Sequence, residues 1–567
     1  MLLLHDPADS RSRYSRYLGE ILRMEGFADW AEADISALDA ALLRRHDLAI
    51  LPRTALSQAQ MDLLLDFVRQ GGRLLALLPD SHLAARLGLR PLFRGLDGGY
   101  LRLDGKHPTV AGLSSEALQI IGPSINWAID PDSKVETLAH IHAALPAEDA
   151  SPVPGVVWSP IGSGHAVAFA YDLPHTVARL RQGNPEHVDL CFAGLDGIYR
   201  PSELFVGQLP VAQMYIPQAD IHTALLARAI EKLAPRPRIW YYPHAQQQSA
   251  LIMTSDDDWS TLEQFETLLA GLRQRQAHCT FYVVPKTRLD RGLMERWEAD
   301  GHIFSVHPAL EADTVSGVKM GEPQSRLVVP MLAANVERHQ RQFGRTPRTI
   351  RQHAVRWLGY VDAARALADL GVRMDLNYIA VSPYLGHLCG SGRPLRFVDT
   401  DGAVIDCFQQ PTHWTEECLI HPEFVFSFKW TVARALAETG ALIRQAARVY
   451  YTPIALNSHP VSFATYSSPL IEGNWDAALA EQMPILSADE WLAWTEARDG
   501  ARLNARPAGW ELRTPAAVEA ITLLLPAGFA VSADDGTVGR QTRWGREYTT
   551  VTFHDLVSGD QRRISYI

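Results

Sequence analysis

Residues 250–259 read ALIMTSDDDW, and this stretch decides how the middle of the chain folds. The apolar run predicts a buried strand from Ala250 to Thr254, with three aspartates directly at its carboxyl end. Barrels and other α/β enzymes place their chemistry at that end of a strand. Three adjacent carboxylates repel one another unless a cation or a proton lies among them, so the stretch predicts a metal site or catalytic carboxylates. The alternative is an acidic turn before a helix, since Ser260 and Glu263 suit a capping box.

Length and composition indicate a folded protein of several domains. The chain has 567 residues, 47% of them hydrophobic and 21% charged, which favours roughly three to four globular domains. The formal net charge of −11 gives no electrostatic reason to expect nucleic acid or an anionic membrane surface as a partner. We therefore expect no nucleic-acid partner, and the sequence does not indicate an oligomeric state.

Cysteine usage and the first residues bear on the compartment. The five cysteines are an odd number, are widely spaced and include no CxxC, so free thiols are expected rather than disulfides or a thiolate zinc site. The four apolar residues at the start are followed at once by His5 and Asp6, which is not a signal peptide. No apolar run approaches the roughly 18 residues of a membrane helix. The sequence as it stands predicts a cytoplasmic protein, which an upstream start would change.

The first part of the chain has a strand–helix–strand rhythm. Strands are expected at 48–51 and 73–78, with a helix from Ser57 between them that ends at the glycine pair 71–72. A further buried strand is expected at 166–172. This parallel α/β layer resembles the class I glutamine-amidotransferase-like fold, in the non-catalytic version fused to carbohydrate-active enzymes. The turn after Leu78 reads PDSH and lacks the cysteine such enzymes need, so we interpret residues 1–236 as a structural or sugar-binding domain.

Two further domains are predicted. Prolines 235, 237 and 243 indicate a linker, and strands and helices alternate from residue 237 to about 500. Residues 501–567 change character, because 547–553 and 562–566 alternate polar and apolar side chains with period two and are separated by turn residues. A small antiparallel β-domain is therefore expected at the end of the chain.

Four polar clusters follow predicted strands in a fixed order. They read TSDD at 254–257, GHIFSVH at 301–307, IRQH at 350–353 and LNSH at 456–459. Over about residues 245–495 this order resembles the NodB-type polysaccharide deacetylases, carbohydrate esterase family 4. The resemblance implies a distorted (β/α) barrel for residues 237–500, so the fold class expected for the whole chain is α/β.

The resemblance also implies a metal site. Asp256 matches the general base of that family, and Asp257 and His307 match two metal ligands. Where the family has its third ligand, a histidine four residues after the second, this chain has Glu311. A carboxylate suits that coordination position, but we favour His353, because it shares a strand face with Arg351. Zinc is the expected ion for a mixed histidine and carboxylate site, although cobalt or nickel would fit the same ligands.

The remaining catalytic assignments come from the same comparison. Arg351 matches the arginine that orients the base, and His459 matches the histidine that protonates the leaving amine. Asp375 matches the aspartate that pairs with that histidine, which would raise its pKa.

Four aromatic side chains are weaker candidates for a role in binding a sugar. Trp259 and Trp414 are the candidates for stacking against the substrate, and Trp357 and His413 could also provide such a surface. For each of the four, a place in the core is the better interpretation.

Together these assignments predict a metal-dependent hydrolase that removes N-acetyl groups from an amino-sugar polysaccharide or oligosaccharide. One alternative is a glycan-binding or assembly protein with a degenerate barrel, which Glu311 in place of histidine favours. Another is a metal-dependent amidase acting on a C–N bond outside sugars.

Overall fold

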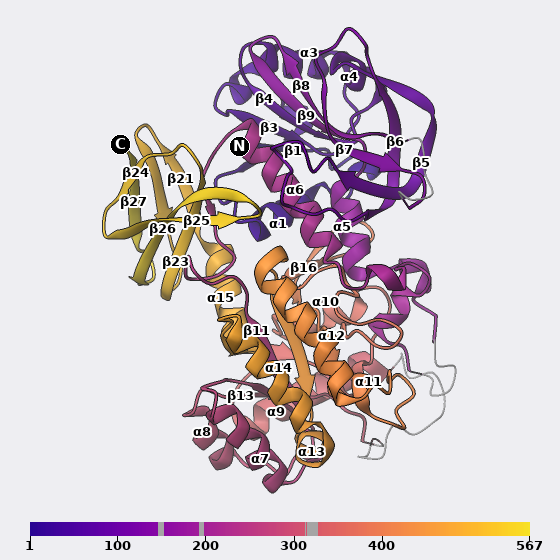
Figure 1. Cartoon of the computed structure of the whole chain (residues 1–567), viewed down its shortest axis with the longest axis vertical. Coiled ribbons are helices and arrows are strands. Elements are labelled where there is room, and N and C mark those ends of the chain that lie inside the picture. Colours follow the sequence, from indigo (N-terminus) through magenta and orange to yellow (C-terminus); the bar gives the residue numbers. More distant parts are fainter. Residues whose placement is uncertain (146–151, 192–197, 312, 314–326) are drawn as a thin grey trace.

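The computed structural model describes residues 1–145, 152–191, 198–311, 313 and 327–567, and it is a mixed α/β structure (Figure 1). The predicted α/β class is confirmed at that level. Figure 1 shows the N-terminal sheet at the top, a second sheet with its helices below it, and the C-terminal strands at the left. None of the helices in the described ranges combines the length and the apolar character needed to span a bilayer.

The N-terminal sheet has nine strands in the order β2-β1-β3-β4-β9-β8-β7-β5-β6. Its parallel half is β2 (Ala31–Asp34), β1 (Leu2–His5), β3 (Leu48–Leu51), β4 (Arg73–Leu77) and β9 (Gly164–Phe169). Of this half, β3, β4 and β9 were predicted, and β1 and β2 were not. The antiparallel half, β8 (Val153–Ile161), β7 (Glu136–His142), β5 (Leu89–Leu103) and β6 (Leu118–Ile129), was not. The likeness to an amidotransferase therefore stays a prediction.

The helices of this part include α1 (Ser15–Met24), α3 (Gln58–Arg69), α5 (Leu173–Gln182) and α6 (Gln218–Leu233). The helix start expected at Ser57 is confirmed, since the Ser57 side chain accepts a hydrogen bond from the Gln60 N–H and Gln60 caps the Ser57 N–H in return. This reciprocal capping box satisfies backbone donors that the first helical turn leaves free.

The second sheet has ten strands and curls. Its order is β16-β17-β15-β14-β13-β12-β11-β19-β18, with β20 (Ile485–Ser487) also paired to β11. The strands are β11 (Leu251–Asp256), β12 (Thr280–Val283), β13 (Ile303–Val306), β14 (Thr349–Ile350), β15 (Met374–Asp375), β16 (Leu395–Val398), β17 (Val404–Gln409), β18 (Trp414–Thr415) and β19 (Ile454–Ser458). Every pairing is parallel except that of β16 with β17. Between β16 and β18 the named strands are not paired, so the sheet is open there rather than a closed barrel.

The helix after β11 starts one residue later than the sequence predicted. The capping box of α7 (Leu262–Arg273) is formed by Thr261 and Gln264, not by Ser260 and Glu263. Ser260 is engaged elsewhere, because its hydroxyl donates to the Asp257 carbonyl oxygen at 2.5 Å and accepts from the Val461 N–H at 3.1 Å. Asp258 and Trp259 adopt positive φ angles of 41° and 58°, which turn the chain sharply between strand and helix.

The edge strand β16 is covered by the N-terminal part of the chain. The Gln182 amide in α5 donates to the Val398 carbonyl at 2.8 Å and accepts from the Val398 N–H at 2.9 Å. Next to it, the Gln409 amide donates to the Arg181 carbonyl at 2.8 Å. Because an uncovered edge strand invites pairing with other chains, these contacts give the N-terminal part a structural role.

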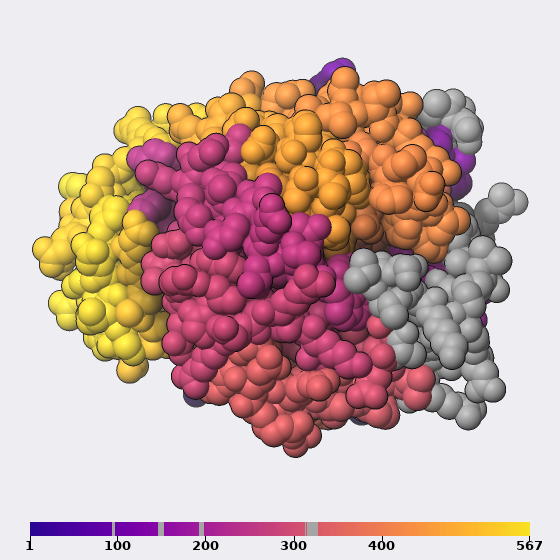
Figure 2. Space-filling model, turned by 90° about the horizontal axis from the view of Figure 1, so that it is seen from below, coloured from indigo at the N-terminus to yellow at the C-terminus, as the bar shows by residue number. Residues whose placement is uncertain are grey.

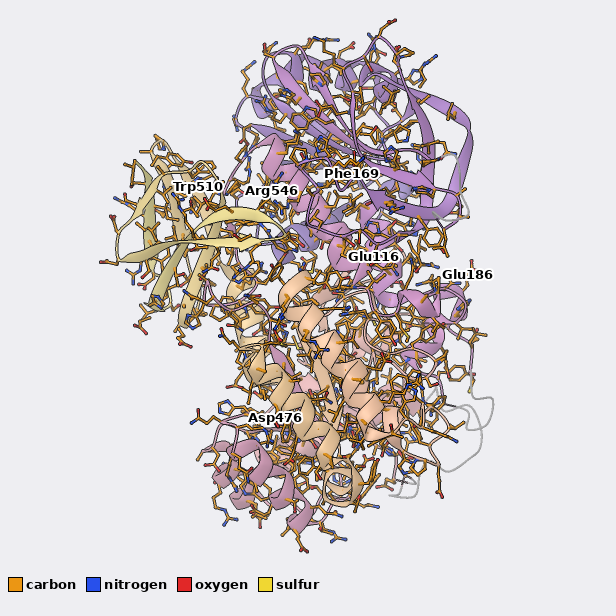
Figure 3. All side chains as sticks on the ribbon, viewed as in Figure 1. Glu116, Phe169, Glu186, Asp476, Trp510 and Arg546 are labelled. Atoms are coloured by element: carbon orange, nitrogen blue, oxygen red, sulfur yellow. The ribbon has the colours of Figure 1, made fainter. Side chains whose placement is uncertain are left out.

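The C-terminal strands form two four-stranded antiparallel sheets, as predicted for their type. One is β10-β23-β26-β25 and the other β21-β22-β27-β24. The strands of the first are β10 (Arg238–Ile239), β23 (Val518–Pro526), β26 (Arg546–Leu556) and β25 (Gly536–Arg543). Those of the second are β21 (Arg502–Arg506), β22 (Gly509–Arg513), β27 (Gln561–Tyr566) and β24 (Val531–Ala533). Strand β10 comes from the predicted linker, so the linker belongs to this part of the structure. Arg546, labelled in Figure 3 with Trp510 and Phe169, reaches the N-terminal part and donates to the Pro108 carbonyl at 2.6 Å.

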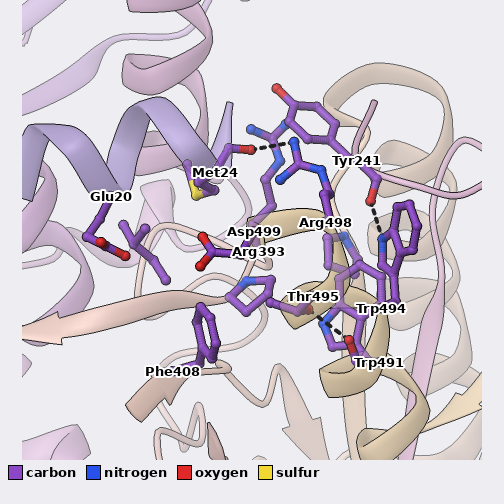
Figure 4. A pocket seen from close by; sticks show the side chains of 13 residues that line it. Glu20, Met24, Tyr241, Arg393, Phe408, Trp491, Trp494, Thr495, Arg498 and Asp499 are labelled. Carbon is purple, nitrogen blue, oxygen red and sulfur yellow. Dashed lines mark hydrogen bonds between the residues drawn. The ribbon is translucent and has the colours of Figure 1, made fainter. Parts of the chain in front are cut away.

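A pocket lies where the N-terminal part, the linker and the part of the chain with the curled sheet meet (Figure 4). Arg498, in α15 (Ala488–Gly500), donates to the carbonyl of Met24 at 2.9 Å and to that of Trp240 at 2.8 Å. Trp494 donates from its indole to the Tyr241 carbonyl at 2.9 Å. Hydrogen bonds thereby join α15 to the end of α1 and to the linker.

Candidate active site

The predicted clusters meet at the carboxyl end of the curled sheet. Strands β11, β13, β14 and β19 lie in the same sheet and run parallel through β12, so their carboxyl ends share one edge. Figure 2 views the lower end of the molecule, where the magenta segments near residues 250–310 lie beside orange segments near 430–480. Parallel pairing therefore brings together residues up to two hundred positions apart in the sequence.

Asp256 ends β11 and is held by two side chains. Its Oδ1 accepts from Arg351 Nη1 at 3.2 Å, and its Oδ2 accepts from Asn457 Nδ2 at 2.8 Å. The side chain of Arg351 is completely buried, and it also donates to the Thr412 hydroxyl at 2.9 Å and to the Leu376 carbonyl at 3.2 Å. A guanidinium fixed by so many acceptors has one orientation, so Asp256 is fixed as well. The structure therefore brings Arg351 and Asp256 into contact, as the sequence predicted.

Two histidines, His307 and His459, lie about 4 Å from this carboxylate, and a third, His353, lies beside His307. Each of the three is oriented through the same ring nitrogen. The Nδ1 atom of His307 is 2.7 Å from the Arg351 carbonyl oxygen, that of His353 is 3.0 Å from Asp313 Oδ2, and that of His459 is 2.8 Å from Glu416 Oε1. An oxygen acceptor at Nδ1 requires a proton there and leaves Nε2 as the free nitrogen of a neutral ring. This arrangement is the usual preparation of a histidine to bind a metal or move a proton.

The carboxylate that the structure places among the histidines is that of Asp258. Its Oδ1 is 3.3 Å from His307 Nε2, and its Oδ2 is 3.7 Å from His459 Nε2. Burial alone would raise the pKa of Asp258, but the close approach of His307 and the nearby rings of His353 and His459 hold that pKa well below its usual value. Asp258 is therefore a stable anion in this position.

Asp257, which was predicted to be a metal ligand, is bonded to backbone N–H groups and forms no ion pair with the described histidines. Its carboxylate accepts from the Ser260 N–H at 3.1 Å and from the Val284 N–H at 3.3 Å. Burial raises its pKa to about 6, against hydrogen bonds from Thr287 and Val284 that lower it. The physical reason for the one-residue correction is the left-handed conformation at Asp258, which reverses the direction of the side chains after the strand.

The donor set suits a divalent ion in its chemistry, and one pair of donors has a fitting separation. Two ligands about 2.0–2.1 Å from a tetrahedral ion are about 3.3 Å apart, which is the separation of Asp258 Oδ1 and His307 Nε2. The same Oδ1 is buried and accepts no hydrogen bond. Among the described residues, no three His, Cys, Asp or Glu side chains stand in a complete metal-binding arrangement, and the rings of His307 and His353 are 5.6 Å apart at their centres. The His353 side chain would have to rotate toward Asp258 and His307 to become the third ligand.

Of the two candidates for the third ligand, His353 is the one near the other donors. Its ring meets that of His307, and Asp313 orients it. Asp313 is itself held by Arg356 Nη2 at 2.8 Å. Glu311 is exposed and lines a neighbouring cavity instead.

The partner of His459 is Glu416, not Asp375 as predicted. Glu416 is completely buried at the start of α11 (Glu416–Ile420), and its Oε1 accepts from both the backbone N–H and Nδ1 of His459. Burial would lower the pKa of His459, but Glu417 and Glu416 raise it well above the usual value. The carboxylate of Asp375 instead bonds the side chain and the backbone N–H of Asn377, and burial raises its pKa to about 7.

The aromatic candidates divide into one near the site and three in the core. Trp259 is partly exposed, and its ring meets that of His353 edge-on at 5.2 Å. Trp414, Trp357 and His413 are buried. Trp414 is therefore corrected from a substrate platform to a core residue, because its faces are covered by neighbouring side chains.

Four residues of this arrangement were missed in the sequence. Asn457 was within reach, because it alternates with His459 along a predicted strand and so shares its face. Asp258 belonged to the quoted aspartate run, but the turn that selects it is not visible in the sequence. Glu416 and Asp313 gave no signal, because each meets its histidine through contacts 43 and 40 positions apart in the chain.

No protein-family profile matches the chain, and neither does any curated protein. Solved structures give partial likenesses. A candidate polysaccharide deacetylase from Mycobacterium smegmatis is 16% identical over 47% of this chain and 97% of its own, with a TM-score of 0.35. An exo-β-1,4-mannosidase from an Opitutaceae bacterium is 13% identical over 31% of this chain and 32% of its own, with a TM-score of 0.23. A β-galactosidase from Bacillus circulans is 11% identical over 28% of this chain and 25% of its own, with a TM-score of 0.23. This chain spans a third or less of those two glycosidases.

Proposed function

We propose that this chain is a metal-dependent hydrolase that removes N-acetyl groups from an amino-sugar-containing glycan. The observation that carries the proposal is the set of three histidines, each held through Nδ1, around the two carboxylates of Asp256 and Asp258. Hydrolysis of an amide needs a base for water, an electrophile for the carbonyl oxygen and an acid for the amine. The arrangement offers a residue or a ligand set for each task.

Asp258, His307 and His353 would hold the divalent ion, and zinc suits this mixture of carboxylate and imidazole ligands. When bound, such an ion lowers the pKa of a water molecule and polarises the acetyl carbonyl. The role of the protein at this point is orientation, because the Arg351 carbonyl and Asp313 fix the two imidazoles.

Asp256 and His459 would move the protons. Asp256 accepts the proton of the attacking water, and the hydrogen bonds from Arg351 and Asn457 aim its carboxylate. His459 Nε2 lies 3.9 Å from Asp256 Oδ2, on the same side of the site. With Glu416 stabilising its protonated form, His459 donates a proton to the departing amine.

The first test is elemental analysis of the purified chain beside an assay of acetate released from chito-oligosaccharides. We expect about one divalent ion per chain, and we expect a chelator to abolish acetate release and added zinc to restore it. Metal binding without acetate release from any N-acetylated glycan would favour the non-sugar amidase. A chain that binds no ion after incubation with zinc or cobalt would leave the glycan-binding alternative.

A second test concerns the positioning of His459. Glu416→Gln keeps the size of the side chain but removes the charge beside Nδ1, so we expect kcat to fall by about 10²–10⁴-fold. KM and metal content are expected to stay unchanged, because Glu416 touches neither the ligand set nor the substrate. Glu423→Gln is the control, since Glu423 is exposed and lies a few residues further along the same segment, so its loss should leave kcat within about twofold of the wild type. An equal loss in both variants would contradict the assignment.

A further inference from the structure

A cavity of about 100 Å³ adjoins the candidate site. The residues of its wall that matter here are Trp259, Lys286, Leu310, Glu311, Asp313 and Arg338. Lys286 and Glu311 lie at its exposed rim, and Arg338 is half-buried. Most of the six follow the carboxyl ends of β11, β12 and β13, the edge of the sheet that carries the aspartates and His307. Arg338 comes from α9 (Val328–Phe343), one helical turn beyond Asn335, which holds the loop after β13 by donating to the Ala309 carbonyl at 3.3 Å.

Two contacts join this cavity to the metal-ligand candidates. Trp259 directly follows Asp258, and its indole meets the ring of His353. Asp313 lines the cavity and accepts the hydrogen bond of His353 Nδ1. A sugar whose acetamide lies at Asp258 and His353 therefore reaches this cavity with its next substituent or residue, passing Trp259.

The charges of the cavity wall are not balanced internally. Within the described part of the chain, the side chains of Lys286, Arg338 and Glu311 form no ion pair or hydrogen bond. Asp313 is already neutralised by Arg356 and His353. The wall thus carries two free cations and one free carboxylate on a protein whose formal net charge is −11. Free cations on a substrate-facing wall of an acidic protein attract an anion that the rest of the surface repels.

We propose that this cavity is a subsite for an anionic substituent of the substrate, a carboxylate or a phosphate on the N-acetylated sugar, bound by Lys286 and Arg338. The proposal rests on the proposed deacetylase function, since it places the acetamide at the neighbouring aspartates. Trp259 provides an apolar face for the sugar ring, and Glu311 accepts hydrogen bonds from ring hydroxyls. The substrate class is therefore an acidic amino-sugar glycan rather than a neutral one.

The test compares three ligands on the full-length, zinc-loaded chain by ligand-observed NMR titration. N-Acetylmuramic acid and N-acetylglucosamine 6-phosphate carry an anion, and N-acetylglucosamine is the neutral reference. We expect at least one acidic sugar to bind about tenfold more tightly than the neutral sugar, as two partly exposed ion pairs allow. The two acidic ligands distinguish carboxylate from phosphate.

The double variant Lys286→Met and Arg338→Met removes both charges and keeps the side-chain length. It is expected to bind all three sugars with the affinity of the neutral one, and Lys106→Met, an exposed lysine of the N-terminal part, is expected to behave as the wild type. Melting temperatures establish that the variants are folded. Equal binding of acidic and neutral sugars by the wild type, or a preference that survives in the double variant, would overturn the subsite. Binding does not require turnover, so acetate release from a neutral glycan with no acidic preference overturns the subsite alone, and an acidic preference without acetate release counts against the deacetylase alone.

Discussion

Asp258→Asn is expected to weaken binding of the divalent ion by about 10²-fold or more and to lower kcat/KM for acetate release by at least about 10³-fold. The reason is that the Asp258 carboxylate faces the Nε2 atoms of both His307 and His459. An amide has no charge to offer the ion and to balance the imidazoles. The measurements are metal content by elemental mass spectrometry and steady-state kinetics of acetate release.

Asp257→Asn is the matched control for this prediction. The asparagine keeps the size of the side chain, and its amide oxygen accepts one of the two backbone N–H bonds, from Ser260 or Val284, that end on different oxygens of Asp257. Metal content should therefore be retained, and activity should change by less than tenfold. Loss of the ion in the Asp257 variant with retention in the Asp258 variant would restore the assignment drawn from the sequence resemblance. That result would contradict the placement of the three aspartates described above.

Arg238→Met is expected to destabilise the fold by about 3–5 kcal/mol, the usual effect of leaving a buried charge without its partner. Arg238 is buried, and its Nε donates to Glu231 Oε1 at 2.9 Å while its Nη1 donates to Glu25 Oε2 at 3.3 Å. Both carboxylates are also buried. Since Glu25 follows α1 and Glu231 lies in α6, this arginine of β10 joins the linker to the N-terminal part. Thermal unfolding followed by calorimetry measures the effect.

Arg291→Met provides the comparison at an exposed ion pair. Arg291 meets Glu295 at 2.7 Å, and both side chains are about 60% exposed, so the loss should be below about 1 kcal/mol. If the Arg238 and Arg291 variants unfold at the same temperature, the prediction for Arg238 is wrong. In that case Arg393 and Tyr241, which also bond Glu25, satisfy that carboxylate without Arg238.

The sequence determined the class of the fold and the residues that end the strands. Apolar runs and helical spacing predicted β3, β4, β9 and β11 and the helix from Ser57, because each depends on neighbours within a few positions of the chain. The same local patterns placed Asp256, His307 and His459 at strand ends. The antiparallel half of the N-terminal sheet and the pairing of β10 with β23 were not predicted, because strand partners distant in the chain leave no periodicity of their own.

The finer arrangement of the site was decided by the tertiary structure. Which of three adjacent aspartates faces the histidines depends on a left-handed turn at Asp258. The carboxylates that orient His353 and His459 come from a loop and from the start of a helix, each about 40 positions away. Local sequence specifies backbone propensity and the alternation of side chains along a strand. Which side chains converge beyond the strand ends depends on how the strands pair and how the loops pack over them, and those contacts exist only once the whole sheet has formed.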